Sequence, residues 1–112
     1  MIALEIVEER QSDRRCERVG RVPHGPEWTE GHFPGFPVVP GFVQLAWAIE
    51  AAQVLIGVEM PSRIESLKFR EPLRPGDAIV LRVERVTGGA QFSLDRNGSM
   101  ISSGRLLFDS AR

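Results

Sequence analysis

The longest apolar stretch of the chain is FVQLAWAIEAAQVLI, which starts directly after Gly41. It contains no proline or glycine until Gly57, and its alanine, leucine and glutamine residues favour a helix. Pro40 is suited to the entrance of a first helical turn, and a glycine is suited to its exit. The pattern therefore predicts a helix over residues 41–56.

This predicted helix has very few polar positions. They are Gln44, Glu50 and Gln53. A helix that is apolar nearly all round must be covered on most of its sides. We therefore expect it to lie in the core of the domain.

Shorter runs with strand-like composition lie on both sides of the helix. One or two opening strands are predicted before it and four strands after it. The predicted ranges are 2–8, 15–22, 63–71, 77–86, 90–96 and 99–109. In the run over 77–86, Ile79, Leu81 and Val83 alternate with Val80, Arg82 and Glu84. This alternation has the period of a half-buried strand.

The last three predicted strands are separated by hairpin signals. Gly88-Gly89 and Asn97-Gly98 are dipeptides typical of tight β-turns. These strands are therefore expected to form an antiparallel meander. The pieces predict a single α+β domain over residues 1–112, in which one central helix is wrapped by an antiparallel β-sheet.

Composition excludes several classes of protein. The chain has 14 basic and 15 acidic side chains and a net charge of −1, which argues against a dedicated nucleic-acid binder. The N-terminus does not have the pattern of a signal peptide, and no window is long and apolar enough to span a bilayer. The single cysteine, Cys16, fits a reducing cytoplasm. One cysteine with His24 and His32 does not form a metal-ligand cluster.

The segment before the helix is dense in proline and glycine and is predicted to be an ordered loop over residues 23–40. Within it, His32-Phe33-Pro34-Gly35 is followed by Pro37, Pro40 and Gly41. A second motif after the helix contains Lys68-Phe69-Arg70, Pro72 and Pro75-Gly76-Asp77. In order and spacing, both motifs resemble those of FabA/FabZ-type 3-hydroxyacyl-acyl-carrier-protein dehydratases, which have the hotdog fold. The segment VVPGFVQLAWA is similar in sequence to the ApeI-like dehydratases of aryl-polyene clusters.

The resemblance implies dehydration of a (3R)-hydroxyacyl thioester to a trans-2-enoyl thioester. His32 would remove a proton from the carbon next to the thioester carbonyl, a task suited to neutral imidazole. The N–H of Gly41 would hold the thioester oxygen, because amides at a helix N-terminus are unpaired and lie at the positive end of the dipole. The rigid loop would fix these groups in one geometry.

The chain departs from the family pattern at the helix carboxylate, whose position is Ala46. Alanine cannot donate a proton, and loss of a general acid typically costs roughly a hundred- to ten-thousand-fold in rate. Glu50 lies one turn further along the same face, where burial would raise its pKa and allow it to donate. The alternative is that Glu50 is a polar residue at a subunit contact.

Other residues receive roles by the same resemblance. An acyl-chain tunnel would be lined by Phe33, Phe36, Ala46 and Phe69; the alternative for the three phenylalanines is that they belong to the core. A contact with the acidic acyl carrier protein would be made by Lys68, Arg70 and Arg74, although a charge run is more often a solvated face. His24 is expected in a surface loop, and Trp28 over the core or the site entrance. No cofactor is expected beyond the phosphopantetheine that carries the substrate.

The apolar helix also predicts an oligomer. So small a chain cannot cover such a helix with its own sheet, and a symmetric dimer would cover the rest. We expect a homodimer in which His32 of one subunit faces the stripe of positions 46 and 50 of the other. Three functions remain open. The first is an active dehydratase that uses His32 with Glu50 or water in place of the missing carboxylate. The others are a non-catalytic hotdog subunit that binds a carrier protein or completes a heterodimer, and a hotdog thioesterase.

Overall fold

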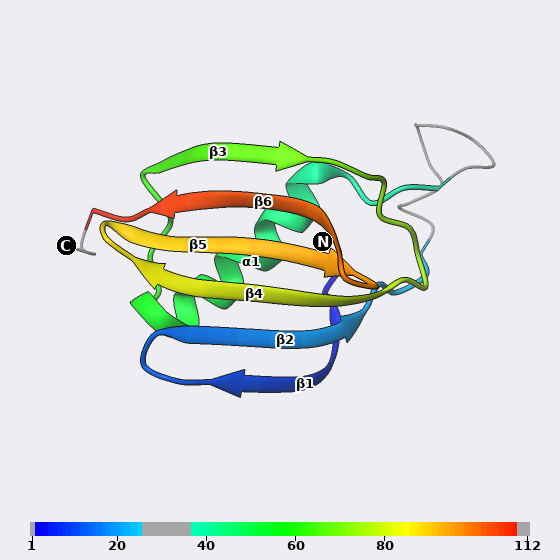
Figure 1. The fold of residues 1–112 in the computed structure, drawn as a ribbon, viewed down its shortest axis with the longest axis horizontal. Helices are drawn as coiled ribbons and strands as arrows, with labels where there is room; N and C mark the ends of the chain where they lie inside the picture. Colours follow the sequence, from blue (N-terminus) through cyan, green and yellow to red (C-terminus); the bar gives the residue numbers. More distant parts are fainter. Residues whose placement is uncertain (1, 26–36, 110–112) are drawn as a thin grey trace.

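The computed structural model describes residues 2–25 and 37–109. These residues form one α-helix and six β-strands (Figure 1). The elements, in chain order, are β1 (Glu5–Gln11), β2 (Arg15–Arg21), α1 (Gly41–Ile56), β3 (Arg63–Phe69), β4 (Ala78–Val86), β5 (Gly89–Arg96) and β6 (Ser99–Leu107).

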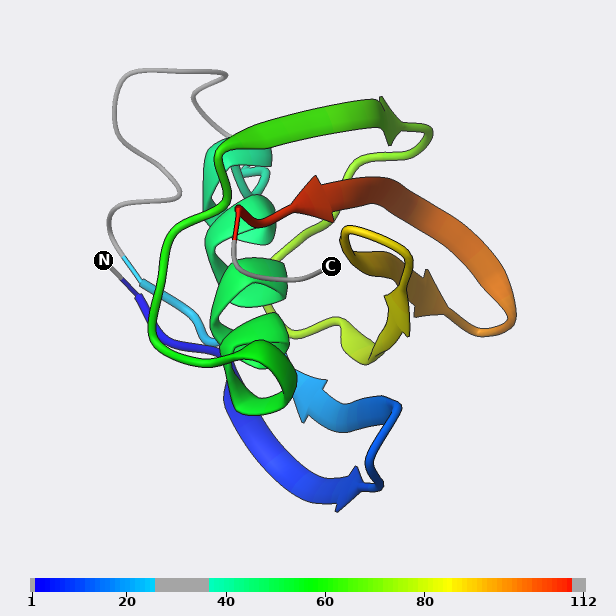
Figure 2. The same ribbon diagram turned by 90° about the vertical axis from the view of Figure 1, so that its left-hand side faces the viewer.

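The six strands form one sheet in the order β1-β2-β4-β5-β6-β3, and every neighbouring pair is antiparallel. Figure 2 shows that the sheet curves and that α1 lies on its concave side. The predicted architecture, a central helix wrapped by an antiparallel sheet, is confirmed.

The bounds of α1 are those predicted from the sequence. The helix begins after Pro40 and ends at Ile56. The next residue, Gly57, has φ +119°. Few residues other than glycine adopt that backbone conformation, so the helix ends there. One face of α1 is buried against the sheet; its buried residues are Val43, Gln44, Trp47, Ala48, Ile49, Ala51 and Ala52.

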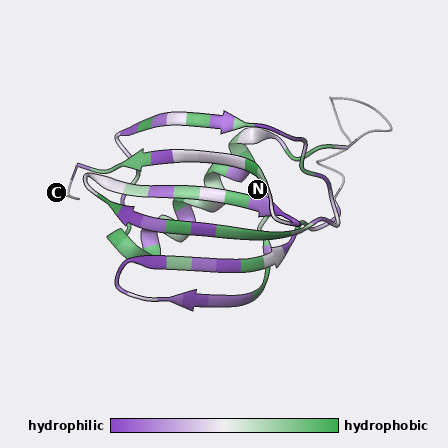
Figure 3. Cartoon of the chain, viewed as in Figure 1, coloured by the Kyte–Doolittle hydropathy of each residue, from purple (hydrophilic) through white to green (hydrophobic). Residues whose placement is uncertain are grey.

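The sheet contributes the other half of the core through alternate positions of its strands. In β4, Ile79, Leu81 and Val83 are buried, as the alternation predicted. Figure 3 shows hydrophobic and hydrophilic residues following one another along the central strands. Full burial of each such side chain contributes about 1.5–3 kcal/mol.

The predicted meander of the last three strands is also confirmed. Asn97 and Gly98 between β5 and β6 have φ of 51° and 80°, as a type I′ turn requires. Gly88, between β4 and β5, has φ +85°. Its neighbour Gly89 approaches β6 so closely that a Cβ atom there would lie 1.9 Å from the carbonyl oxygen of Leu106.

The first predicted strand is misplaced by three residues, since β1 spans Glu5–Gln11 rather than 2–8. The apolar residues at the start of the chain pack against the helix instead of pairing in the sheet. Leu4 is buried in the core, and the carbonyl of Ile2 accepts a 3.0 Å hydrogen bond from Trp47 Nε1. The strand is placed by its pairing with β2, for which Gln11 lies opposite Cys16.

Two later strands end two residues earlier than predicted, β3 at Phe69 and β6 at Leu107. Across residues 2–25 and 37–109, the structure contains no helix with the length and hydropathy that a membrane crossing requires.

Candidate active site

The N-terminus of α1 presents free backbone donors. The carbonyl of Pro40 accepts hydrogen bonds from the N–H groups of Val43 (3.1 Å) and Gln44 (3.4 Å). No acceptor within the described residues receives the N–H of Gly41 or of Phe42. These two amides therefore lie at the positive end of the helix dipole and can bind a partly negative oxygen.

An open cavity of about 570 Å³ lies beside these amides. It joins the end of the proline-rich loop, the first turn of α1 and the second motif. The residues that line it are Val38, Val39, Gly41, Gln44, Phe69, Arg70, Glu71 and Pro72. Both sequence motifs therefore meet at one site.

Phe69 forms one wall of this cavity and packs directly on the helix N-terminus. A Cβ atom built on Gly41 would lie 2.8 Å from Phe69 Cζ. A larger residue at position 41 would displace this ring, which is 47% exposed. The sequence had assigned Phe69 to an acyl tunnel, and the structure places it at the amide that would bind the thioester.

Gln44 is a buried polar group in the same cavity, and its side chain is only 3% exposed. Its Nε2 donates a 3.3 Å hydrogen bond to the carbonyl of Val39, whose own N–H donates to the carbonyl of Leu73 at 2.7 Å. Its Oε1 is buried and has no hydrogen-bond partner in the part of the chain that the structure describes. The sequence predicts no role for Gln44. The signal that could have found it is a polar residue among the buried positions of an apolar helix.

Several predicted residues lie outside the part of the chain that the structure describes. They are Trp28, His32, Phe33 and Phe36. Their predicted roles stay predictions. His24 is described, is exposed, and its Nε2 would lie 3.1 Å from a Cβ atom built on Gly76. The expected surface position of His24 is confirmed.

Ala46 and Glu50 lie on a different face of α1, away from the cavity lining. The side chain of Glu50 is 66% exposed, and its Oε1 lies 3.9 Å from Arg18 Nη1. The expected burial of Glu50 is therefore not supplied by its own chain, where the side chain stays exposed beside Arg18 of β2. Its role as an acid stays a prediction.

Arg18 is itself largely buried and is bonded mainly to Glu9. The hydrogen bond from Arg18, with a second from Gln11, holds the pKa of the Glu9 carboxyl below its ordinary value. Arg18 therefore links β1 and β2 to the exposed face of α1.

The predicted basic run divides into two parts. Lys68 and Arg70 line a second cavity of about 250 Å³, together with Arg105 of β6. Because Phe69 faces the helix and side chains alternate along a strand, Lys68 faces the outer surface of the sheet. Arg74 does not line this cavity; its backbone N–H donates to Asp77 Oδ2 at 2.9 Å.

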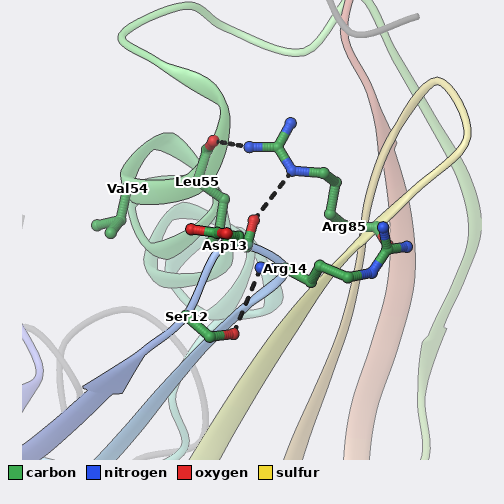
Figure 4. A pocket seen from close by; sticks show the side chains of 6 residues that line it. All are labelled: Ser12, Asp13, Arg14, Val54, Leu55 and Arg85. Carbon is green, nitrogen blue, oxygen red and sulfur yellow. Dashed lines mark hydrogen bonds between the residues drawn. The ribbon is translucent and has the colours of Figure 1, made fainter.

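A third cavity lies at the opposite end of α1 (Figure 4). Arg85 of β4 donates hydrogen bonds to the carbonyls of Leu55 and Asp13 there. This arginine joins the C-terminal carbonyls of the helix to the turn between β1 and β2, which is a structural role.

Metal-binding and thiol chemistry have little support in the described residues. Across 2–25 and 37–109, no group of three or more His, Cys, Asp or Glu side chains is placed to hold a metal ion. Cys16 is fully buried, and burial raises the pKa of its thiol. A buried, protonated thiol is a poor nucleophile.

The model of the ApeI dehydratase family matches residues 8–105, which is most of the chain. The chain belongs to the ApeI-like family. The match includes the loop before α1, the helix and the second motif, so it covers every element of the candidate site. The resemblance to FabZ-type dehydratases is confirmed with it.

This ApeI-like chain is also similar to curated FabZ proteins. The 3-hydroxyacyl-[acyl-carrier-protein] dehydratase FabZ of Chlamydia trachomatis serovar D is 34% identical over 93 residues, which cover 70% of this chain and 61% of that protein. FabZ of Koribacter versatilis is 29% identical over 93 residues, covering 75% and 60%. The chain thus spans about 60% of the length of these relatives.

Solved structures confirm the hotdog fold. The dehydratase heterocomplex ApeI:P from Xenorhabdus doucetiae contains a chain with TM-score 0.84 and 25% identity, and the match covers 95% of this chain and 97% of that one. An uncharacterized protein from Erwinia carotovora subsp. atroseptica has TM-score 0.77 at 23% identity and shows the fold alone.

Proposed function

We propose that this ApeI-like chain dehydrates a 3-hydroxyacyl thioester carried on acyl carrier protein, giving a trans-2-enoyl thioester. The single observation that carries the proposal is the pair of amides at Gly41 and Phe42, which no acceptor among the described residues receives, beside a cavity lined by both family motifs. Membership of a dehydratase family gives this geometry its chemical meaning.

In the proposed reaction, the Gly41 N–H binds the thioester oxygen and stabilises the negative charge that develops as the neighbouring carbon loses its proton. His32 acts as the base, on the strength of its motif. The hydroxyl leaves as water after protonation, and the electron pair of the broken C–H bond forms the new double bond.

The exposed face of α1 supports assembly with a second hotdog subunit. Phe42 is 67% exposed, and Val54 is also exposed on this helix. Ala46 and Glu50 lie between them on the same side, as their spacing of four residues requires. Exposed apolar side chains such as Phe42 and Val54 on the helix of a small domain favour a dimer contact.

Carrier-protein docking is supported by the outer-surface cavity. Lys68, Arg70 and Arg105 line it together, and none of the three has an ion pair within the described residues. Arg70 also lines the cavity at Gly41, so an acidic carrier docked at the basic cavity would lie next to the proposed site.

A second candidate function is that of a heterodimer subunit whose partner supplies the missing acid. Ala46 at the position of the family carboxylate favours it, as does similarity to a chain of a dehydratase heterocomplex. An active homodimer is expected to dehydrate its substrate without another protein, whereas a heterodimer subunit requires a second hotdog chain.

The test is a turnover assay of purified protein with 3-hydroxyacyl-carrier thioesters, alone and with a candidate partner chain, following enoyl product. Activity that disappears in His32→Ala supports the proposal. Release of free thiol without enoyl product indicates a thioesterase instead. Absence of turnover alone, with turnover in the presence of a partner, supports the heterodimer subunit.

A further inference from the structure

The amide of Gln44 is held in one orientation. Its Nε2 donates to the carbonyl of Val39, which can only accept, so the nitrogen must face Val39 and the oxygen must face away. Among the described residues, the buried Oε1 atom has no hydrogen-bond partner, and Gln44 is only 3% exposed. Buried acceptors are rarely left unpaired, so an orphan in the lining of a candidate site calls for a ligand donor.

Gln44 lies three residues after Gly41 and lines the same cavity. Residues three apart are neighbours on a helix surface. The first turn of α1 therefore offers this cavity two complementary groups, a backbone donor at Gly41 and a side-chain acceptor at Gln44. A ligand that satisfies both must carry an acceptor and a donor close together.

A 3-hydroxyacyl thioester has this arrangement, because its carbonyl oxygen is an acceptor and its 3-hydroxyl is a donor two carbons away. We infer that Gln44 binds the 3-hydroxyl group of the substrate through Oε1, while Gly41 binds the carbonyl oxygen. This inference rests on the proposed function. It gives the site a polar contact for the hydroxyl that Ala46 cannot supply and that the exposed Glu50 does not supply within its own chain.

The contact assigns Gln44 a defined part in the elimination. When the substrate hydroxyl donates its proton to Oε1, a lone pair on the hydroxyl oxygen stays available to accept a second proton. The base takes a proton from C2, the C2–H electron pair forms the C2–C3 double bond, and the C3–O bond breaks with its electrons on oxygen. The protonated base gives its proton to the leaving hydroxyl oxygen, so water leaves and the base is regenerated. The amide transfers no proton.

The test compares two reactions of the same protein. Dehydration of a 3-hydroxyacyl-carrier thioester needs the hydroxyl contact. Exchange of C2 hydrogen for deuterium in the matching saturated acyl thioester needs the base and Gly41, but this substrate has no hydroxyl. The variant is Gln44→Met, which keeps chain length and removes the acceptor oxygen. The matched control is Gln53→Met on the same helix, because Gln53 donates to the carbonyl of Glu59 and does not line the cavity.

We expect Gln44→Met to lower kcat for dehydration by about ten- to a hundred-fold, the loss typical of one hydrogen bond to a buried group. Deuterium exchange should stay within about twofold of the unsubstituted protein, and Gln53→Met should leave both rates within the same limit. Gln44→Glu, which keeps an acceptor oxygen, should lose less dehydration than Gln44→Met, and it carries the test if the methionine variant does not fold.

Equal loss of dehydration and exchange in Gln44→Met would overturn the inference, since it would mean that Gln44 acts only by holding Val39 and the helix start. Unchanged dehydration would overturn it as well, and so would equal losses in the Glu and Met variants. A protein that shows exchange but no dehydration in its unsubstituted form would contradict the proposed function, and the Gln44 inference would fall with it.

Discussion

The ring of Phe69 lies on the α-carbon of Gly41, so that a Cβ atom at position 41 would be 2.8 Å from Cζ of the ring. This contact joins the end of β3 to the first residue of α1. The amide proposed to bind the thioester is therefore positioned by a side chain of the second motif.

Gly41→Ala should lower both stability and activity. The added methyl group meets the aromatic ring, which is 47% exposed and can turn aside, so the loss should lie at or below the low end of the about 1–3 kcal/mol typical of overpacking, partly offset by the better helix propensity of alanine. Thermal unfolding and the dehydration assay measure the two effects. Adding Phe69→Leu should recover much of the lost stability, whereas a Gly41→Ala protein as stable and active as the original would contradict the contact.

Ala46→Glu should raise dehydration activity by about tenfold or more, because it restores a carboxyl group at the family position, and a positioned acid contributes roughly a hundredfold or more. Ala46→Gln, which cannot donate a proton as an acid, is the control and should give no such gain. Steady-state rates on a 3-hydroxyacyl-carrier substrate provide the measurement.

Glu50→Gln decides between the two interpretations of Glu50. Because this side chain is exposed in its own chain and lies near Arg18, we expect the substitution to change the rate by less than about threefold. Loss of activity by a hundredfold, combined with no gain in Ala46→Glu, would instead identify Glu50 as the acid.

Phe42→Lys should weaken self-association. Phe42 is 67% exposed in the single chain, and a charge in an apolar contact between subunits must be desolvated. Sedimentation velocity over a range of concentrations should show a shift from dimer to monomer. Val58→Lys, at a residue 97% exposed just beyond the helix, is the control and should leave the distribution unchanged.

Arg96→Met should destabilise the turn of the second motif. Nη1 of Arg96 donates to the carbonyl of Pro72 (2.9 Å) and to Asp77 Oδ2 (2.7 Å), and both charged side chains are partly buried. We expect a loss of about 1–2 kcal/mol in the free energy of unfolding, measured in urea. Arg10→Met breaks the exposed pair with Glu8 and should cost close to nothing. Equal losses in the two variants would contradict the role of this pair.

Stability should depend on the ionisation of Glu9. Hydrogen bonds from Arg18 and Gln11 lower the folded-state pKa of Glu9 below its ordinary value of 4.5. The carboxylate therefore contributes stability that is present above the unfolded-state pKa and is lost as pH falls through the lower, folded-state pKa. Urea unfolding at neutral pH and below about pH 4 should show a smaller pH dependence in Glu9→Gln. An identical dependence in both proteins would exclude Glu9 as a source.

The helix and the meander were predictable because their signals are local. Uninterrupted apolar residues between Pro40 and Gly57 define α1, and Asn97-Gly98 defines a turn by its positive φ angles. The opening strand was misplaced because Ile2 and Leu4 have strand-like composition but pack against α1, a choice set by tertiary contacts that composition does not contain.

The candidate site was predictable only in part. The motifs identified Gly41 and Phe69, and the cavity brings them together. The orphan oxygen of Gln44 could not be read from the sequence, because it depends on the position of the Val39 carbonyl. The same is true of Glu50: an apolar helix suggested burial, but its side chain is 66% exposed beside Arg18 of β2.

The 2.7 Å hydrogen bond from the Val39 N–H to the Leu73 carbonyl has a consequence for engineering the protein. Exchanging the loop over residues 23–40 between ApeI-like chains, to change their acyl preference, would replace the donor Val39 but not the acceptor Leu73. Chimeras that exchange residues 37–41 together with residues 69–77 should keep the helix start in place. Those that exchange the loop alone should inherit a displaced Gly41 and lose rate regardless of the acyl chain offered.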